Sequence, residues 1–306
     1  NVTLMGSGWS TKLYLVDGAN TDVIVVGDGT NSYEGITIAN LQIDGNDANN
    51  SSGRGIYFNM YISKSLIDNV YIHDTWHAGI YLSHSTYNVI RHSKIQYCGT
   101  GNGGIYLWYS SNNLIEGNRL YLNSYEGVVA YSGSFNRIIG NIFENNKHGI
   151  YFYNMSNNII SNNVFRNNNG NGVAIQASEY NTIEGNTFKD NSGTDIYLFK
   201  YTTSYSTHNL VQNNFIYYTT SKIGIAEGEA EDDYNIIQNN LIKCPAGVTA
   251  ISVKGSHTTV AGNKTSDTQE GLFQITTTPS STQTALTVTQ SGSGNIIDLK
   301  GEGLTT

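Results

Sequence analysis

Charged residues and proline are scarce in this chain of 306 residues: Asp, Glu, Lys and Arg make up 13% of it, and proline occurs twice. An ordinary globular domain carries about 25% charged residues. The 16 Lys and Arg are spread along the whole chain and the formal net charge is -8. Because phosphate binding needs clustered basic side chains, these numbers argue against nucleic acid as a partner. No apolar run approaches the roughly 18 residues of a membrane span, so we expect no transmembrane segment.

Turn-forming and aromatic residues are abundant instead. The chain has 33 Gly, many Asn, Ser and Thr, 22 Tyr and 9 Phe. A disordered chain carries far fewer aromatic and β-branched residues, so the composition excludes disorder. It predicts an all-β fold that is rich in turns.

A short strand motif recurs through most of the chain. The segments are GIYF from Gly55, GIYL from Gly79 and Gly104, GVVA from Gly127, GIYF from Gly149, GVAI from Gly172 and DIYL from Asp195. Their starts are 24, 25, 23, 22, 23 and 23 residues apart. A constant period in the twenties with about three β segments per unit is typical of a solenoid, here of about ten coils. Leucine-rich repeats share this period, but Ile, Val and Phe alternate with polar residues here, as strands require.

Asparagine recurs at a fixed place in a second pattern, as in NLIEGN from Asn113 and NTIEGN from Asn181. Stacking the coils puts one file of Asn at a corner between strands: Asn118, Asn141, Asn163, Asn186, Asn214, Asn240 and Asn263. Each amide can donate and accept along the stack, and Asn tolerates the left-handed backbone that we expect at such corners. We therefore interpret this file as structural. Phe143, Phe165 and Phe188 fall on inward positions and should stack in the core.

The repeat sets the expected domain boundaries. Residues 1–265 should form the solenoid, and residues 266–306, rich in Thr, Ser and Gly, a C-terminal β cap or the start of a further module. Two long adjacent turns, in FKYTTSYSTHN and EGEAEDDYN, are expected to wall one end of a groove. Cys98 and Cys244 fall six coils apart, which is nearly 30 Å at roughly 4.8 Å per coil. We expect two free thiols, which carry no information on the redox compartment.

The strand motif also predicts aromatic columns on one outward face. Ile and Leu of GIYLWY point inward, so the Tyr between them and the aromatic residue two positions later point outward. The two columns are Tyr57, Tyr81, Tyr106, Tyr151 and Tyr197, and beside it Trp108, Tyr131, Tyr153 and Phe199. An exposed aromatic ribbon is unusual, and the apolar faces of sugar rings stack on such rings while Asn59, Ser83 and Gln176 suit their hydroxyls. The alternative is a tyrosine ladder that only stabilises the strands by cross-coil stacking.

Ionisable residues gather at the turn that leads into this face. Arg54 precedes Gly55, and one coil later Asp74 and His77 precede the next strand. We expect these three side chains within a few ångströms of one another. In a lyase acting on a uronic-acid polymer, Arg54 would neutralise the carboxylate, His77 or Tyr81 would take the sugar proton, and Asp74 would orient His77. Alternatively, Asp74 caps a turn and His77 is an ordinary surface residue.

A glycoside hydrolase would instead need two carboxylates about 5 to 9.5 Å apart. Glu126 lies near His148, which occupies the same place one coil later, but has no acidic neighbour on the next coil. The better hydrolase candidate is Asp195, joined by Glu227 and Glu229 reaching back from their long turn. The same acidic turn could equally hold calcium or be solvated, and its spacing fits no specific metal motif.

The GIYL and SNNLIEGN repeats resemble those of the pectate-lyase-like superfamily over about residues 35 to 265. This superfamily includes polysaccharide lyases, glycosidases, epimerases, NosD-type periplasmic proteins and phage tailspikes. The resemblance implies a right-handed, single-stranded parallel β-helix, and a place in the tailspike or polysaccharide-degrading branch. The chain has neither the DPH motif of mannuronan epimerases nor the combined NTD, DD, GHG and RIK set of polygalacturonases.

The two ends of the chain resemble parts of virion proteins. NVTLMGSGWSTKLYL is similar to the first coils of tailspikes, and ALTVTQSGSGNIIDLKGEGLTT to segments that follow the helix in tail fibres. These likenesses imply a piece of a longer, extracellular or virion-associated protein that forms a homotrimer. The leading hypothesis is a protein that binds and cleaves a polysaccharide along the aromatic columns. The alternative is a non-catalytic β-helix, either a carbohydrate-binding adhesin or a structural surface-layer or NosD-like component.

Overall fold

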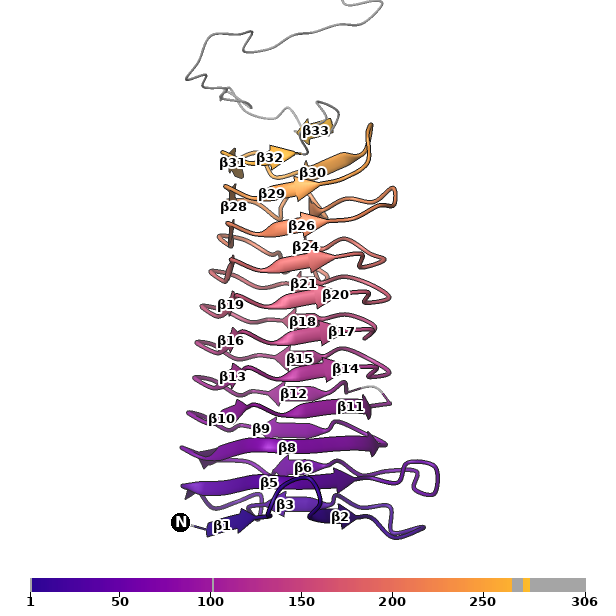
Figure 1. Cartoon of the computed structure of the whole chain (residues 1–306). Coiled ribbons are helices and arrows are strands. Elements are labelled where there is room, and N and C mark those ends of the chain that lie inside the picture. Colours follow the sequence, from indigo (N-terminus) through magenta and orange to yellow (C-terminus); the bar gives the residue numbers. More distant parts are fainter. Residues whose placement is uncertain (1, 101, 266–271, 276–306) are drawn as a thin grey trace, which may run out of the picture.

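The computed structural model describes residues 2–100, 102–265 and 272–275, which wind into one stack of coils (Figure 1). Strands of successive coils pair in parallel, as in Ile105↔Val128 and Lys94↔Arg119. One sheet has eleven strands, one from each coil. The expected all-β fold of about ten coils is therefore confirmed. Among the described residues no helix is long and apolar enough to cross a membrane.

The eleven-stranded sheet forms one face of the stack. It consists of β3 (Ile24–Val26), β6 (Ile56–Phe58), β9 (Ile80–Ser83), β12 (Ile105–Trp108), β15 (Val128–Tyr131), β18 (Ile150–Tyr153), β21 (Val173–Gln176), β24 (Ile196–Phe199), β27 (Ile225–Glu227), β30 (Thr249–Val253) and β33 (Leu272–Ile275).

The other two faces belong to one sheet of twenty strands. They are joined because β5 (Ile36–Asp44) and β8 (Leu66–Thr75) run through the corner that separates the faces in later coils. One face continues with β10 (Val89–Arg91), β13 (Leu114–Glu116), β16 (Arg137–Ile139), β19 (Ile159–Ser161), β22 (Thr182–Glu184), β25 (Leu210–Gln212), β28 (Ile236–Gln238) and β31 (Thr259–Ala261), and includes β1 (Val2–Met5).

The third face, at the front of Figure 1, starts at β2 (Lys12–Tyr14) and passes through β5 and β8. It continues with β11 (Lys94–Cys98), β14 (Arg119–Tyr121), β17 (Ile142–Glu144), β20 (Val164–Arg166), β23 (Thr187–Lys189), β26 (Phe215–Tyr217), β29 (Leu241–Lys243) and β32 (Lys264–Thr265). A small pair, β4 (Tyr33–Glu34) and β7 (Ile62–Ser63), completes the described strands.

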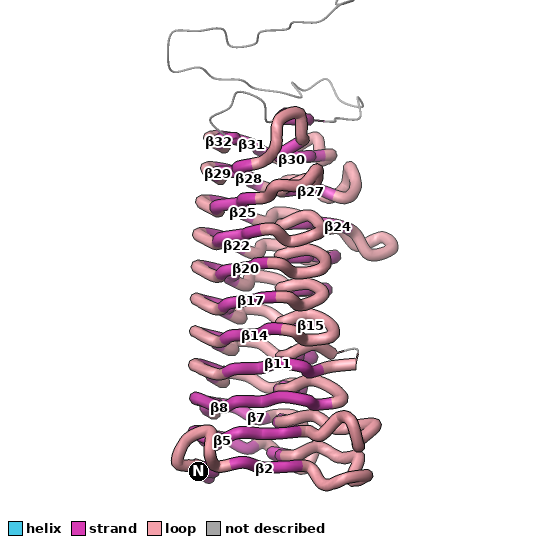
Figure 2. Tube along the Cα trace, turned by 45° about the vertical axis from the view of Figure 1, so that its right-hand side comes forward, coloured by secondary structure: helices cyan, strands magenta, loops and turns pink. Residues whose placement is uncertain are grey.

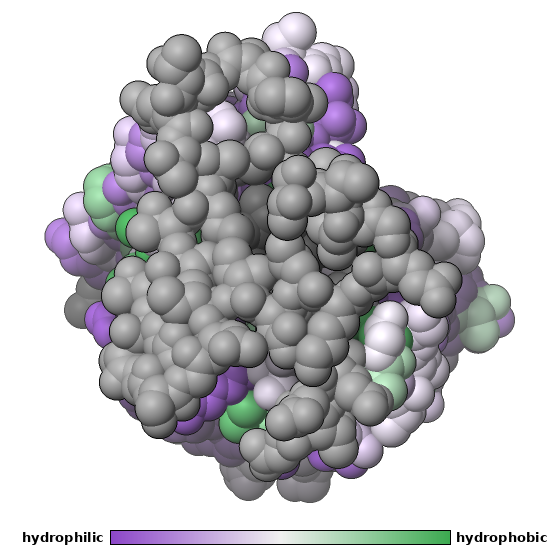
Figure 3. All heavy atoms as spheres, turned by 90° about the horizontal axis from the view of Figure 1, so that it is seen from above, coloured by the Kyte–Doolittle hydropathy of each residue, from purple (hydrophilic) through white to green (hydrophobic). Residues whose placement is uncertain are grey.

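The core runs up the middle of the stack, because alternate residues of each strand point inward. The central residues of the three-residue strands, such as Ile115 and Leu120, are fully buried. Phe143, Phe165 and Phe188 stack with ring centroids 4.8 Å apart, as predicted. Seen down the stack, the sides of the molecule carry mostly hydrophilic residues with small hydrophobic patches between them (Figure 3).

The predicted asparagine file is present and buried. Asn141, for example, accepts from the backbone N–H of Asn118 at 2.8 Å and donates to the carbonyl of Ile115 at 2.9 Å. Two further ladders, absent from the prediction, line the other corners: one from Asn88 to Asn235 and one from Asn123 to Asn191. Each buried donor or acceptor left without a partner would cost about 1–3 kcal/mol, so the ladders fix the register of the coils.

The left-handed backbone expected of these asparagines occurs one residue earlier. Gly117, Gly140 and Asn162, directly before Asn118, Asn141 and Asn163, have φ of 63°, 66° and 55°. This position turns the chain, and the ladder residue that follows directs its amide into the stack. The prediction of left-handed asparagines in the file was therefore wrong in position, because the pattern did not separate the turning residue from the hydrogen-bonding one.

The two long turns project beside the eleven-stranded sheet, and Figure 2 shows one of them next to β24. Tyr201 in the first turn packs edge-on against Tyr153 at 4.8 Å. Cys98 and Cys244 are buried and, among the described residues, form no disulfide, as expected. The predicted C-terminal cap, and the closing segment whose likeness implied a trimer, lie outside the described residues except for β33.

Candidate functional site

The aromatic columns form on the outer side of the eleven-stranded sheet. Tyr57, Tyr81 and Tyr106 are register partners on β6, β9 and β12, and Tyr151 and Tyr197 continue the column. Val129 and Ala174 fill the intervening coils. Trp108, Tyr131, Tyr153 and Phe199 form the second column, with Gln176 between the last two. We call these two columns together the aromatic face.

The aromatic face is more closed than the exposed ribbon that the sequence predicted. Tyr81 and Tyr106 stack at 4.7 Å, and Trp108 and Tyr131 approach to 5.7 Å. The predicted residues are half-buried, and Tyr106 is only 9% exposed. Large rings on coils roughly 4.8 Å apart lean on their neighbours, which covers much of each ring. The aromatic rings therefore do stack between coils, and a ligand can reach them only at hollows in this surface.

One such hollow lies at the N-terminal part of the aromatic face. It has a volume of about 170 Å³ and is lined by Arg54, Tyr81, Asn102, Tyr106 and Trp108. We call it the Arg54 site. The guanidinium of Arg54 lies 3.9 Å from the ring centroid of Tyr57 and 4.6 Å from that of Tyr81, so cation–π contacts hold it flat on the column.

The charge of Arg54 is loosely compensated. Its Nη1 lies 3.6 Å from a carboxylate oxygen of Asp22, and this buried nitrogen makes no hydrogen bond. Burial raises the pKa of Tyr81 to about 12, although Arg54 opposes this shift. Burial also raises the pKa of Tyr106, more strongly. Both phenols therefore keep their protons at neutral pH and act as hydrogen-bond donors.

His77 is not among the residues that line this hollow, but it contacts Asn102, which is. The Asn102 amide nitrogen is 3.4 Å from Nδ1 of His77, and Asn102 itself lines the Arg54 site. The sequence analysis missed Asn102, although it occupies the same place before Gly104 that His77 occupies before Gly79. Asp22 was not predicted either; it lies two positions before Ile24, the first residue of β3 that pairs with β6.

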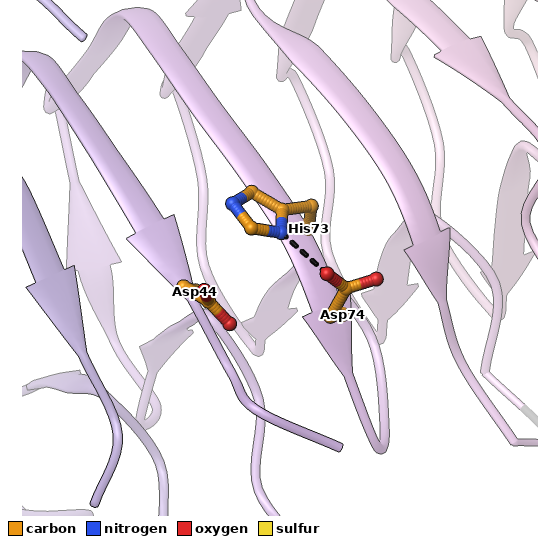
Figure 4. Close-up of side chains that lie close together, drawn as sticks. All are labelled: Asp44, His73 and Asp74. Atoms are coloured by element: carbon orange, nitrogen blue, oxygen red, sulfur yellow. Dashed lines mark hydrogen bonds and ion pairs between the residues drawn. The ribbon is translucent and has the colours of Figure 1, made fainter. Parts of the chain in front are cut away.

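The predicted role of Asp74 is wrong. Asp74 Oδ2 lies 2.7 Å from Nδ1 of the preceding residue, His73, and makes no described hydrogen bond to His77 (Figure 4). Its φ of 52° breaks the alternation of the strand. This turn places Asp74 beside His73 at the end of β8, on the third face of the stack.

Asp44, His73 and Asp74 form the one group among the described residues whose metal-ligating atoms all lie within 4.8 Å of one another. These atoms already have protein partners. Lys12 Nζ is 2.7 Å from Asp44, and the Gln42 amide nitrogen is 2.7 Å from Nε2 of His73. The group is therefore a satisfied polar network as it stands.

Glu126 and His148 occupy the turns one and two coils beyond Asn102, which lines the Arg54 site. Glu126 is buried, has Lys147 Nζ at 3.9 Å, and has a raised pKa because of burial. Nδ1 of His148 accepts from the backbone N–H of Asn171 at 2.8 Å. Burial, with a smaller contribution from Lys147, lowers the pKa of His148 to about 4. His148 is thus a neutral residue that supports the turn.

The predicted hydrolase pair does not form. Asp195 is fully buried against Lys222, whose Nζ lies 2.7 Å from Oδ2. Glu227 takes the inward position that Leu198 takes one coil earlier, and accepts from Asn235, Thr258, Lys254 and Gly255. Glu229 pairs with Lys200 at 3.7 Å. These three carboxylates stabilise turns and face different partners.

Several polar residues that we expected to contact sugar hydroxyls or calcium form hydrogen bonds within the protein instead. Gln176 accepts from the hydroxyl of Tyr151 and donates to the carbonyl of Lys200 at 3.0 Å. Ser83 is buried beside His84. In the acidic turn, Asp232 accepts from the backbone of Ser206 and Glu229, and Asp233 from that of His257. The residues suggested for calcium therefore bind the protein's own donors.

Two family models match the chain. The model described as "Right handed beta helix region" matches residues 7–157, and that of "Periplasmic copper-binding protein (NosD)" matches residues 100–229. The Asp44, His73 and Asp74 network lies outside the second match. A search of curated proteins found no match.

Solved structures share the fold at low sequence identity. The A-module of a mannuronan C-5 epimerase from Azotobacter vinelandii has a TM-score of 0.75 and 18% identity, over 91% of this chain and 83% of that one. The surface adhesin PfbA of Streptococcus pneumoniae has a TM-score of 0.60 and 14% identity, over 90% and 83%. A Geobacillus virus E2 protein has a TM-score of 0.61 and 15% identity, over 90% and 50%. Together, the family models and the solved structures show that this chain has a right-handed parallel β-helix fold.

Proposed function

We propose that this protein binds an acidic polysaccharide along the aromatic face and cleaves it by β-elimination at the Arg54 site. The observation that carries the proposal is Arg54 itself: a guanidinium whose charge meets the carboxylate of Asp22 only at 3.6 Å, and which lines a hollow together with tyrosine and tryptophan. A sugar ring fits against the rings, and its carboxylate pairs with the part of the guanidinium that lines the hollow.

Three groups supply the chemistry of elimination. Arg54 neutralises the uronate carboxylate, which makes the proton on the adjacent ring carbon acidic. Nδ1 of His77 takes this proton once the sugar displaces its long contact to Asn102. The electron pair forms the ring double bond, the bond to the leaving oxygen breaks, and the Tyr81 hydroxyl gives that oxygen its proton. Solvent then returns the proton from His77 to Tyr81.

We prefer elimination to hydrolysis because the carboxylates that hydrolysis would need are bound by protein partners. Asp195, Glu227 and Glu229 are each occupied by protein partners. Glu126 is buried in the turn before β15 and has Lys147 Nζ at 3.9 Å. Hydrolysis needs two carboxyl groups about 5 to 9.5 Å apart, whereas elimination needs a cation, a base and an acid.

The test combines two assays on a panel of acidic and neutral polysaccharides: ultraviolet absorbance of an unsaturated uronide, and release of reducing ends. Wild type should produce both signals from a polyuronate. Arg54→Met should lose cleavage and weaken binding, and Tyr81→Phe should lose cleavage but keep binding. Arg137→Met, which removes an exposed arginine on another face, is the matched control. Reducing ends without new absorbance would refute elimination.

The second candidate is a non-catalytic carbohydrate-binding protein. It is favoured by the close packing of Tyr106 and its neighbours, which suits a rigid binding surface. It predicts binding with neither signal on any glycan. If Tyr106→Ala with Trp108→Ala leaves glycan binding unchanged, both candidates fail. For either candidate we propose an extracellular or virion-associated setting, in line with the surface adhesin and viral protein among the structural neighbours.

A further inference from the structure

Positively charged side chains that are far apart in the sequence lie together on the third face of the stack. Two outward columns flank the central residues of its strands. They carry seven of the chain's 16 Lys and Arg. They are Lys12, Lys94, Arg119, Arg166, Lys189, Lys243 and Lys264. Of the 24 Asp and Glu residues, only Asp44 and Glu144 lie in these columns. We call this the basic face.

The two carboxylates leave most of this charge unbalanced. Asp44 pairs with Lys12 at 2.7 Å, and Glu144 is shared by Arg119 and Arg166 at 2.9 and 3.0 Å. No described carboxylate lies within ion-pair distance of Lys94, Lys189, Lys243 or Lys264. With seven cations and two carboxylates, these columns carry a formal charge of +5, although the whole chain has a net charge of -8. The concentration of cations on one face is therefore a property of the fold.

The cations follow a regular spacing along the stack. Lys94 and Arg119 lie on adjacent coils, as do Arg166 and Lys189, and Lys243 and Lys264. One coil separates each pair from the next and carries Glu144 or Tyr217. At roughly 4.8 Å per coil, the pairs repeat about every 14 Å.

Aromatic rings lie between these cations. Lys94 Nζ is 4.3 Å from the ring of Tyr71 and 5.2 Å from that of Tyr121, and Arg119 lies 4.5 Å from Tyr121. Such cation–π contacts restrain the side chains before any ligand arrives. Half-buried Phe215 and Tyr217 continue the aromatic surface towards Lys243.

We infer that the basic face is a second binding site, distinct from the aromatic face, for an anionic polysaccharide lying along the stack. Two cations per 14 Å or so amount to about one positive charge per 7 Å, which suits a polyanion of low charge density. Duplex DNA carries one charge per about 1.7 Å, far denser than these cations, and the acidic remainder of the chain repels it. Interleaved aromatic rings suit the apolar faces of sugars. The inference does not depend on the proposed elimination.

The test uses Lys189→Met with Lys243→Met, two exposed lysines without an ion pair. Affinity for polygalacturonate is measured by titration calorimetry at several salt concentrations. We expect a loss of roughly fivefold per lysine at low salt, and a salt slope that falls by about one unit for each contact removed. Arg137→Met, on another face, should change neither quantity.

The outcomes separate this site from the proposed function. Tyr106→Ala with Trp108→Ala should remove cleavage yet leave a salt-dependent binding event that the lysine variant removes. An unchanged affinity and salt slope in the lysine variant would overturn the inference. So would single-stranded DNA binding more tightly than polygalacturonate at the same salt concentration, or neutral dextran binding equally well.

Discussion

The buried pair of Lys222 and Asp195 gives a sharp test of whether Asp195 is structural or catalytic. Lys222 Nζ lies 2.7 Å from Asp195 and also donates to the carbonyls of Asn191 and Gly193 at 2.7 and 3.2 Å. Asp195 accepts from the Asn191 amide at 2.8 Å and so ends the third asparagine ladder. Lys222→Met leaves this carboxyl buried without a cation, which should cost about 3–5 kcal/mol at neutral pH.

The pH dependence gives this prediction its signature. Burial raises the pKa of Asp195 to about 6 even with Lys222 beside it. A raised pKa means that the stabilising contribution of this group is present in acid and is lost as the pH rises through about 6. Without Lys222 the pKa rises further, so the deficit of Lys222→Met should shrink when the pH falls from about 8 to about 5.

The assay is denaturant unfolding of wild type and Lys222→Met across this range, with hydrogen exchange of the neighbouring coils. Lys200→Met, which breaks a 3.7 Å surface pair with Glu229, is the control and should cost about 1 kcal/mol or less. Two results would refute the reasoning: a deficit that is independent of pH, or an Asp195→Asn variant that keeps its stability but loses all cleavage.

Three further predictions follow from the burial of single side chains. Asn141→Leu leaves the N–H of Asn118 and the carbonyl of Ile115 without partners and should cost about 2–4 kcal/mol. Asn169→Leu, at an exposed turn without a left-handed backbone, should cost far less in the same unfolding assay. The pKa of His148 is lowered to about 4, so its stabilising contribution is present at a pH above the ordinary histidine pKa and is lost as the pH falls through about 4. An imidazole NMR titration with a midpoint near the ordinary pKa would contradict this. Burial raises the pKa of Cys98 to about 12, so alkylation should be slow in the folded protein and fast in denaturant, and rapid native labelling would count against the buried placement.

The repeat itself was predictable because stacking and strand alternation are local rules. A fixed period with inward Ile and Leu determines which residues of GIYL point outward, so the register of Tyr57, Tyr81 and Tyr106 followed from alignment alone. Glu227 was also readable in principle, since IAE aligns with IYL and puts the carboxylate at the inward leucine position. The sequence analysis treated it as part of a turn and therefore missed its burial.

Features that depend on departures from alternation were not predictable in this way. The left-handed backbone at Asp74 turns its side chain towards His73, which removed it from the expected cluster. The half-burial of the aromatic face depends on how rings from several coils tilt against one another. The basic face arises because residues 22 to 28 positions apart coincide in register, a pattern that the net charge does not reveal.

The most direct test of the central claim is the crystal structure of the protein with a bound uronate oligosaccharide, prepared with Tyr81→Phe to prevent turnover. The account predicts a sugar ring in the hollow of the Arg54 site, against Tyr106 and Trp108, with its carboxylate within hydrogen-bond distance of the Arg54 guanidinium. Clear density for the oligosaccharide elsewhere on the molecule, with the Arg54 site empty, would contradict it.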